Sequence, residues 1–368
     1  MKIGRDQVTR RAALTSIGLT ATVGLAAPAI AQGAPAVHWR LVAAFPRTLK
    51  APFAGADTFV SRVSEITDGQ FRIQLFAPGE IVGAFQSLDA AQAGTVEAAY
   101  SPSFFFVGKD PTFAIGSALP FGLNVRQHNA WVHEGGGLEL LNAFYDTYNV
   151  HHIPFGHTCA QMAGWYRKEI KQPEDFQGLR IRISGIAGQV LQRLGAVPQQ
   201  TAVSDIYPSL ERGTIDAAEL SGPMDDEAAG LAKVAPYYYY PGWQEPTAAT
   251  GLFINRQAWE SLPKTYQAAV QAAAAEGERR MIAGYDVGNA AALERVVAAG
   301  AQFKAFPNPV LKALFETSES LMAEIAASNE NFGKIYGPWR EYRASIARWF
   351  SIAETPTDLT TQSFLRQK

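Results

Sequence analysis

Two arginines on one predicted strand have the residue type and spacing to bind an anion. Arg180 and Arg182 lie two positions apart in the alternating segment 179–183, so both side chains point to the same face. Arginines at a strand edge are most often solvated. A guanidinium at the C-terminal end of a strand is also a good bidentate partner for a carboxylate, and open α/β sheets bind ligands at such ends. The spacing leaves two interpretations open, a solvated edge and a carboxylate site.

Acidic residues follow the next predicted strand. Glu219 stands at the end of a short strand that begins near Thr214, where a glutamate is usually solvated or caps a helix. Asp225, Asp226 and Glu227 come soon after a proline. Three acids at that position fit the first turn of a helix better than a second metal site. We therefore expect a helix to begin there.

The histidines and the single cysteine carry weaker signals. His151, His152 and His157 share a strand pattern without partner carboxylates, so we expect packed or exposed imidazoles rather than a metal cluster. Cys159 continues that pattern, and we expect it to be buried rather than catalytic. Four consecutive tyrosines at 237–240 alternate between the faces of another strand, so at most two of them can face a cleft.

Composition excludes several classes of protein. The 368 residues are 47% apolar and include 32 Lys and Arg, 34 Asp and Glu and one cysteine, which rules out disordered chains, collagen and disulfide scaffolds. A net charge of −2 without a basic stripe argues against nucleic-acid binding. One core seldom grows beyond ~250–300 residues, so we expect two lobes. The common nucleotide, zinc and serine-hydrolase motifs are absent, which weakens an enzymatic interpretation.

The elements that would position these residues alternate between strand and helix. Segment 71–76 alternates as a strand, 55–66 has helical spacing, and a second cycle begins near residue 179. This alternation predicts an α/β fold with helix-covered parallel sheets. Segment 263–299 has no proline after Pro263 and predicts one long helix that braces both lobes. Segment 309–352 predicts two amphipathic helices before a polar tail.

Residues 1–31 have the pattern of a cleavable export signal. A basic start that includes Arg10 and Arg11 precedes a weakly apolar stretch and the small residues that end at Ala31. The stretch is too short for a permanent membrane anchor. The arginine pair resembles the twin-arginine export pattern, and the Sec route stays open. We therefore expect an exported protein, cleaved after about Ala31.

Several long motifs in the same order carry a family resemblance. Residues 175–182 (DFQGLRIR), 194–198 (LGAVP) and 207–219 (YPSLERGTIDAAE) resemble the DctP-type solute-binding proteins of TRAP transporters. The resemblance extends from about residue 37 to the C-terminal helices. Four further segments resemble the branch of that family that binds 2-oxo and 2-hydroxy monocarboxylates: 76–82, 104–109, 119–123 and 237–243.

The resemblance implies a periplasmic protein with two α/β lobes around a ligand cleft, and it implies no catalysis. Lobe I would comprise residues 37–156, with later segments crossing back, and lobe II residues 157–256. Residues 257–368 would supply the long bracing helix and the C-terminal helices. The captured acid would be delivered to the membrane permease subunits of a TRAP transporter. Some members pair through their C-terminal helices, so a homodimer is an expected partner arrangement.

The resemblance also implies a set of site residues. The carboxylate-binding arginine of the family falls on Arg182, and a bridging Na⁺ or Ca²⁺ would be held by Gln161, Glu219, Glu245 and the backbone carbonyl of Leu220. A carboxylate oxygen and the adjacent 2-oxygen form a five-membered chelate with a hard cation, which prefers oxygen donors. Besides Gln161 and Arg182, the ligand would contact four aromatic rings: Phe45, Phe104, Phe105 and Trp243.

One departure from the branch concerns the size of the pocket. A tryptophan usually follows the metal-binding glutamate, whereas this chain has Leu220, and Gln244 stands where an aromatic residue is common. The carbonyl ligand is retained and the aromatic wall is lost. We therefore expect a roomier apolar pocket that admits branched or aryl 2-oxo acids beside pyruvate-sized ones.

Two other functions stay open on the sequence alone. A secreted metal-dependent enzyme acting on 2-oxo acids would use the same cation with Glu219 as its base, although no nucleophile or cofactor motif supports turnover. A binding protein of this kind could also pass its ligand to a sensor rather than to a permease.

Overall fold

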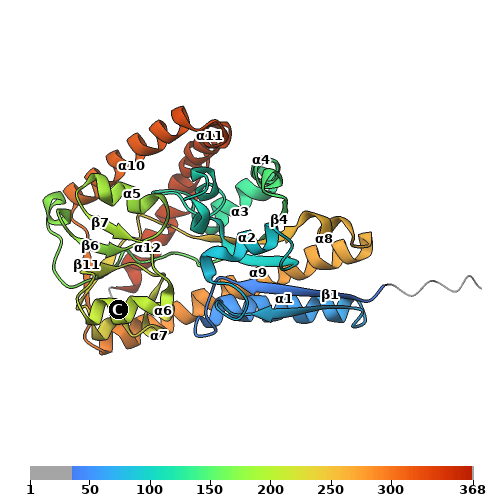
Figure 1. The fold of residues 1–368 in the computed structure, drawn as a ribbon. Coiled ribbons are helices and arrows are strands. Elements are labelled where there is room, and N and C mark those ends of the chain that lie inside the picture. Colours follow the sequence, from blue (N-terminus) through green and yellow to red (C-terminus); the bar gives the residue numbers. More distant parts are fainter. Residues whose placement is uncertain (1–34, 367–368) are drawn as a thin grey trace, which may run out of the picture. The chain divides into compact units, whose positions relative to one another are not determined.

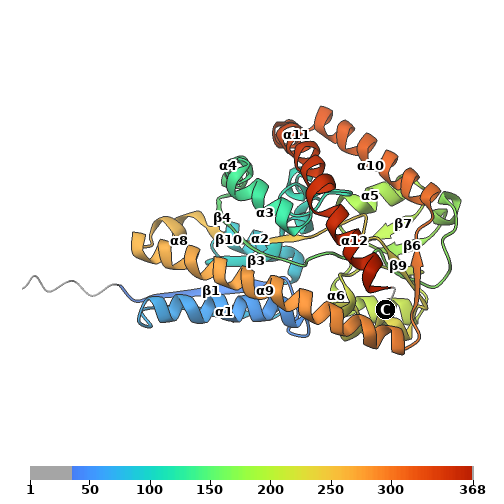
Figure 2. The same cartoon turned by 180° about the vertical axis from the view of Figure 1, so that it is seen from behind.

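A computed structural model describes residues 35–366, so the export signal predicted at residues 1–31 lies outside the described residues. Within the described residues the strands form a five-stranded and a six-stranded sheet (Figures 1 and 2). Across the first sheet the order is β2 (Phe71–Phe76), β1 (Val37–Ala43), β3 (Ala98–Pro102), β10 (Ala249–Asn255) and β4 (Val150–His157). Across the second sheet it is β11 (Gln302–Ala305), β9 (Tyr237–Tyr240), β5 (Gly164–Tyr166), β8 (Ala217–Ala218), β6 (Arg180–Arg182) and β7 (Val197–Gln199).

Both sheets are mixed, so the prediction of parallel sheets is wrong in part. Strand β10 runs antiparallel to β3 and β4, and β5 runs antiparallel to β8 and β9. The chain reaches β5 and β10 directly from the other sheet, with no helix in between. Each of these strands enters its sheet from the side on which the neighbouring strands end, so it runs antiparallel to them. Strand β10 thus joins the first sheet, although it lies in the range expected for lobe II.

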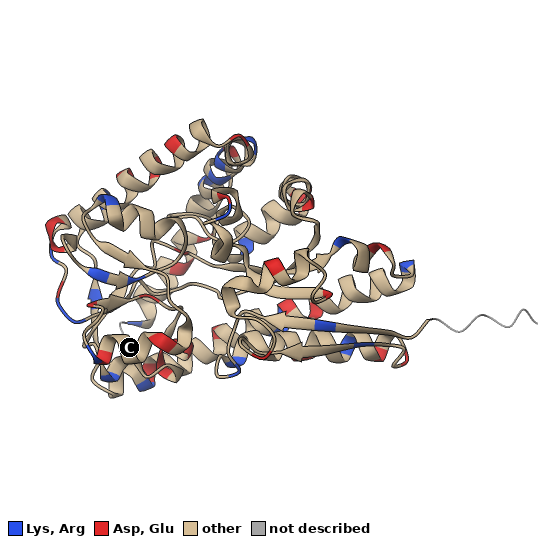
Figure 3. Cartoon of the chain, in the orientation of Figure 1, with Lys and Arg blue, Asp and Glu red and all other residues tan. Residues whose placement is uncertain are grey.

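Helices cover both sheets, and we call each sheet with its covering helices a lobe. The α-helices are α1 (Lys50–Ile66), α2 (Ser87–Gln92), α3 (Val125–Glu134), α4 (Gly137–Tyr145), α5 (Gly185–Arg193), α6 (Val203–Glu211), α7 (Pro223–Ala228), α8 (Arg256–Glu260), α9 (Lys264–Ala298), α10 (Asn308–Ser328), α11 (Glu330–Ala353) and α12 (Thr355–Leu365). Lys and Arg residues (blue) and Asp and Glu residues (red) intermingle over both lobes (Figure 3).

Helix α9 is the long helix that the sequence predicts, and it packs on both lobes. It lies along α1 and β4 of the first lobe and reaches α7 of the second (Figure 2). Its interior glycine Gly277 explains the close approach of α1, because a Cβ there would lie 2.8 Å from the carbonyl oxygen of Gly55. Near its other end Val296 joins the buried cluster of the second lobe around Trp165.

The C-terminal helices also join the two lobes. Helix α10 contacts α5 of the second lobe, and α11 contacts α3 and α4 of the first. The segment that the sequence suggests as a polar tail continues instead as α12. Several apolar side chains of α11 and α12 are exposed, among them Trp349 and Ile352. None of the helices between residues 35 and 366 has the length and apolarity needed to cross a bilayer.

Candidate functional site

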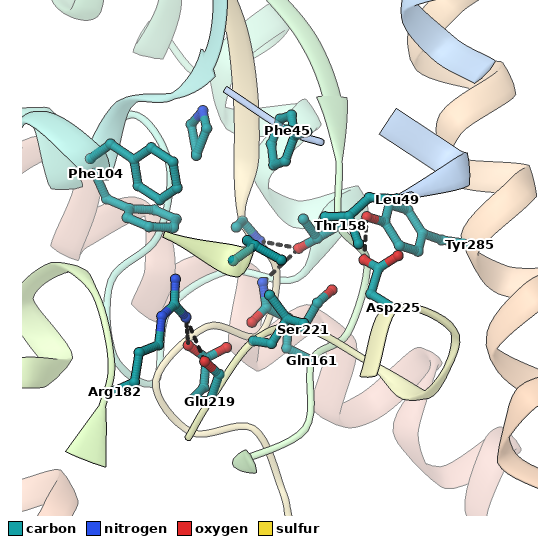
Figure 4. A pocket seen from close by; sticks show the side chains of 15 residues that line it. Phe45, Leu49, Phe104, Thr158, Gln161, Arg182, Glu219, Ser221, Asp225 and Tyr285 are labelled. Carbon is teal, nitrogen blue, oxygen red and sulfur yellow. Dashed lines mark hydrogen bonds and ion pairs between the residues drawn. The ribbon is translucent and has the colours of Figure 1, made fainter. Parts of the chain in front are cut away.

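A pocket lies between the ends of the two sheets and holds about 460 Å³ of free space, its opening to solvent included (Figure 4). Most of the site residues predicted from the sequence line it: Phe45, Phe104, Phe105, Gln161, Arg182, Glu219 and Leu220. The other lining residues were not predicted: Leu49, Pro102, Thr158, Val203, Ser221, Asp225, Ala248 and Tyr285. The pocket therefore brings together groups that lie far apart in the sequence.

The first lobe supplies an aromatic wall. Phe45 follows β1, and Phe104 and Phe105 lie in a short 3-10 turn directly after β3. Strands β1 and β3 are parallel neighbours, so their C-terminal ends open on the same edge of the sheet. The rings support one another, because the centroids of Phe104 and Phe105 are 5.1 Å apart in an edge-on arrangement. This wall presents apolar surface to a ligand.

The second lobe supplies the charged wall. Arg182 ends β6 directly opposite Ala218 of the parallel strand β8, so Glu219 comes next to it. The Nη1 of Arg182 donates to the backbone carbonyl of Glu219 and lies 3.4 Å from its Oε2. The two residues are only 3% and 2% exposed. Arg180, by contrast, binds Asp216 in a bidentate pair outside the pocket, so only one of the two candidate arginines serves this site.

The segment that joins β4 to β5 supplies an amide. The Nε2 of Gln161 donates to the hydroxyl of Thr158 at 2.8 Å, and that hydroxyl oxygen also accepts from the backbone N–H of Ala248. In this orientation the amide nitrogen of Gln161 is the atom that contacts Thr158. The Oε1 of Gln161 is buried and has no hydrogen-bond partner in the described residues.

The electrostatics of the site favour an additional positive charge. Glu245 is 4% exposed and does not line the pocket, but it lies close enough to Glu219 and Arg182 to interact with both. Burial raises the pKa of Glu219 to about 7 against the effect of Arg182. Burial and the charge of Glu219 raise the pKa of Glu245 well above its usual range. With both carboxyls ionised against one guanidinium the formal charge would be −1, so a bound cation would favour the ionised forms and lower both raised pKa values.

The unpartnered oxygens identify the kind of ion that would fit. Besides Gln161 Oε1, the Oε1 of Glu219 is buried without a hydrogen-bond partner in the described residues. A carboxylate and an amide oxygen are ligands that Na⁺ and Ca²⁺ prefer. Across residues 35–366 no three His, Cys, Asp or Glu side chains cluster as a metal site. A cation here would therefore need amide, backbone or ligand oxygens as well, which is the predicted ligand set.

Trp243, like Glu245, is a predicted site residue that does not line the pocket. Its ring packs against Phe121 at a centroid distance of 5.9 Å, and its carbonyl accepts from the backbone N–H of Phe121. The residue is 3% exposed and belongs to a core cluster. The loop after β9 therefore directs this ring into packing against Phe121, and the ligand contact predicted for Trp243 finds no support in the lining of this pocket.

Asp225 is the most informative residue that sequence reasoning missed. The acids do occupy the first turn of α7, as predicted, but Asp225 and Asp226 are buried. Asp225 lines the pocket and accepts a 2.7 Å hydrogen bond from the hydroxyl of Tyr285. The proline followed by acidic residues predicts the start of the helix, but it does not predict which of these acids faces the interior.

The other candidates have structural roles. His157 pairs with Asn129 and Thr247, and His151 stacks on Trp259, so the histidines are packed as expected. Cys159 is buried, also as expected. None of the tyrosines at 237–240 is among the residues that line the pocket.

Comparison with known proteins assigns the family. Residues 46–329 match the model of the DctP family, described as bacterial extracellular solute-binding protein, family 7. The chain belongs to this family. A DctP-type chain is a component of TRAP transport rather than a member of an enzyme family, and the two-lobed α/β architecture predicted from the sequence is confirmed.

Relatives of this DctP-family chain carry more specific descriptions. A monocarboxylate 2-oxoacid-binding periplasmic protein of Nostoc sp. strain PCC 7120 is 42% identical over 88% of this chain and 89% of its own length. A TRAP transporter solute-binding protein from Bordetella bronchiseptica RB50, solved as a mixed-occupancy dimer with copurified calcium and picolinate in one active site, is 45% identical with a TM-score of 0.89. One from Pseudoalteromonas atlantica T6c, with bound sodium and pyruvate, is 32% identical with a TM-score of 0.84. Each of these two matches covers 90% of this chain and 99% of the solved one.

Proposed function

We propose that this protein captures a small 2-oxo or 2-hydroxy monocarboxylate through Arg182 and a bridging Na⁺ or Ca²⁺. The observation that carries the proposal is the pair of buried, unpartnered oxygens of Gln161 and Glu219 in the same pocket as the buried guanidinium. The pocket thus offers one group for an anion and acceptor oxygens for a cation. The relatives described as binding 2-oxoacids, or pyruvate with sodium, support the same ligand class.

The protein groups divide the charges of such a complex. Arg182 offsets the ligand carboxylate, and Glu219 with Glu245 offsets the cation. The Gln161 amide and the Leu220 carbonyl complete the proposed oxygen set. A bound cation supplies chelation of the carboxylate and 2-oxygen, which plain carboxylates cannot match. The two glutamates remain proposed ligands, and their interaction with each other and with Arg182 supports the assignment.

We propose that the side chain of the ligand can be branched or aromatic as well as small. Phe45, Phe104 and Phe105 line one wall, and Leu220 leaves the opposite side without an aromatic ring. The solved relative that holds picolinate supports this size, because picolinate is a flat aromatic acid whose ring nitrogen can chelate together with its carboxylate. We propose that the pocket admits such ligands beside pyruvate-sized acids.

Cellular context follows from the same proposal. The export signal at residues 1–31 would place the mature protein in the periplasm, and the ligand would pass to the permease subunits of a TRAP transporter. Exposed apolar residues on α11 and α12 support a homodimer through the C-terminal helices. Light scattering of the purified protein tests the dimer directly.

A thermal-shift screen tests the ligand and the cation together. Protein lacking residues 1–31 is melted with 2-oxo, 2-hydroxy and plain monocarboxylates of increasing size, each with calcium, with sodium, or with chelator in sodium-free buffer. A ligand at a hundred times its Kd adds ~2.7 kcal/mol to the free energy of unfolding, which raises the melting temperature measurably. We expect shifts for 2-oxo and 2-hydroxy acids that cation removal abolishes. Shifts that survive cation removal, or that appear only with dicarboxylates, would contradict the proposal.

A further inference from the structure

The pocket has a second polar end, which the proposed carboxylate and cation site does not use. Asp225 and Tyr285 line it on the side of α7 and α9, away from Arg182, and Ser221 lies between that side and Glu219, beside Gln161 (Figure 4). The exposed fractions of Ser221, Asp225 and Tyr285 are 4%, 1% and 1%. Polar side chains this deeply buried normally have partners.

Two atoms at this end have none. The hydroxyl of Tyr285 donates to Oδ2 of Asp225 at 2.7 Å, but Oδ1 of Asp225 and Oγ of Ser221 lack hydrogen-bond partners in the described residues. The backbone N–H of Ser221 donates to Asp226 at 3.3 Å, which holds this residue in place. Asp225 Oδ1 and the Ser221 hydroxyl therefore stand next to the same cavity and near each other: the hydroxyl is close enough to lower the pKa of Asp225, yet neither atom has a partner with normal hydrogen-bond geometry among the described residues.

A ligand hydroxyl would satisfy both atoms. It can donate to the carboxylate of Asp225 and at the same time accept from the hydroxyl of Ser221. An N–H group could donate to the carboxylate but could not accept from the serine. Burial raises the pKa of Asp225 to about 6, while the hydroxyls of Tyr285 and Ser221 act in the opposite direction, so the carboxylate form is available near neutral pH.

We propose that Ser221 and Asp225 form a subsite for a hydroxyl group on the side chain of the ligand. The inference rests on the proposed function and narrows its substrate class to 2-oxo or 2-hydroxy acids that carry a further hydroxyl. Arg182 and the cation hold the carboxylate end, the aromatic wall of the first lobe covers the carbon chain, and the subsite receives the far hydroxyl.

Calorimetry with matched ligand pairs tests the subsite. The pairs differ by one hydroxyl and increase in reach: lactate and glycerate, 2-oxobutyrate and 4-hydroxy-2-oxobutyrate, phenylpyruvate and 4-hydroxyphenylpyruvate. Each acid is titrated into the wild-type protein in saturating calcium. We expect at least one pair to show a tenfold or larger preference for the hydroxylated acid, because a buried polar site discriminates against a ligand that leaves it unpaired.

Variants then assign that preference to the two side chains. In the double variant Asp225→Leu with Tyr285→Phe, which removes the carboxylate without leaving an unpaired phenol, the ratio of the two affinities should fall to about one. Ser221→Ala is a smaller change that keeps the test available if the double variant does not fold, and it should lower the ratio at least threefold. Asp286→Asn, an exposed neighbour of Tyr285 on α9, should leave the ratio unchanged.

The outcomes separate this inference from the function on which it rests. Cation-dependent binding of the acids with no preference in any pair, or a preference that both variants retain, overturns the subsite. An absence of preference in every pair would mean that the Ser221 hydroxyl pairs with Asp225 rather than with the ligand. Absence of binding by every acid overturns the proposed function, and the subsite with it.

Discussion

The first lobe contributes rings to the pocket, whereas the second lobe contributes charge. Phe45, Phe104 and Phe105 come from the edge of the first sheet, while Arg182 and Glu219 come from the edge of the second. The charged pair lies within one lobe, on two neighbouring strands, so its geometry does not depend on how the lobes approach each other. The carboxylate and the cation can therefore be held by one rigid wall, and the other wall contacts the remainder of the ligand.

This difference between the lobes predicts which substitutions the binding site tolerates. An apolar wall accepts substitutions of similar volume at small cost. A buried charged wall does not, because removing one partner leaves the others desolvated and unpaired. Variants of the second lobe should therefore decide whether any acid binds, and variants of the first lobe should decide which acid binds best.

Loss of the guanidinium is expected to have the largest effect. In Arg182→Met the buried carboxyls lose the guanidinium that lowers their pKa values, and the ligand loses the partner of its carboxylate. We expect a loss of about 2–5 kcal/mol in binding free energy, roughly 30- to 5000-fold in Kd, measured by calorimetry with phenylpyruvate and calcium. Wild-type affinity in this variant would show that the charged wall is not where the acid binds.

A matched control is available on the same strand. Arg180→Met removes an arginine two positions earlier, whose partner Asp216 lies outside the pocket. Exposed ion pairs contribute about 0–1 kcal/mol to stability, so this variant should melt slightly earlier and bind normally.

Loss of the amide oxygen should have the next largest effect, and it should act through the cation. In Gln161→Leu the buried Oε1 is removed while the side chain keeps a similar volume. We expect calcium affinity, titrated into chelator-treated protein with saturating ligand, to fall by about 10- to 100-fold, by analogy with changes around other metal sites. Gln199→Leu, at an exposed glutamine of β7, is the control. Equal calcium affinity in the two variants would remove Gln161 from the proposed ligand set.

Leu220 is the apolar exception on the charged wall, and it sharpens the comparison. In Leu220→Trp the backbone carbonyl stays and the side chain fills part of the pocket. We expect the affinity ratio of phenylpyruvate to pyruvate to fall about tenfold, because the larger acid loses space that the smaller one does not use. The measurement is calorimetry of both acids in one buffer, and an unchanged ratio would show that Leu220 does not set the pocket size.

The sequence predicts the charged wall better than the surroundings of that wall. Arg182 and Glu219 end strands within continuous motifs, and neighbouring parallel strands bring their ends together. Local patterns also predict α9 and most of the other elements. The direction of β5 and β10 is not local, because it depends on which sheet the chain has just left.

Trp243 and Asp225 show which information the sequence patterns lack. The residue type of Trp243 suits a pocket wall, but its position depends on packing against Phe121, which lies on a different loop. Asp225 is an acid in a helix start, and its burial depends on a hydroxyl from Tyr285, 60 residues further along the chain. Both outcomes are decided by partners that no spacing rule within one segment identifies.

Substitutions in the aromatic wall should change affinity least, and they test whether the two walls have separate roles. Phe105 packs edge-on against Phe85, with centroids 4.8 Å apart, and only Phe105 of this pair lines the pocket. In Phe105→Leu we expect affinities to change by less than about tenfold, with aryl acids losing more than pyruvate because ring contacts contribute roughly 0.5–1.5 kcal/mol each. Phe85→Leu should change the ranking of acids less. Calcium dependence should be the same in both variants and in the wild type, because neither ring supplies an oxygen to the proposed cation. A loss of calcium dependence in Phe105→Leu would mean that both lobes take part in holding the charge, and the two walls could then no longer be treated as separate.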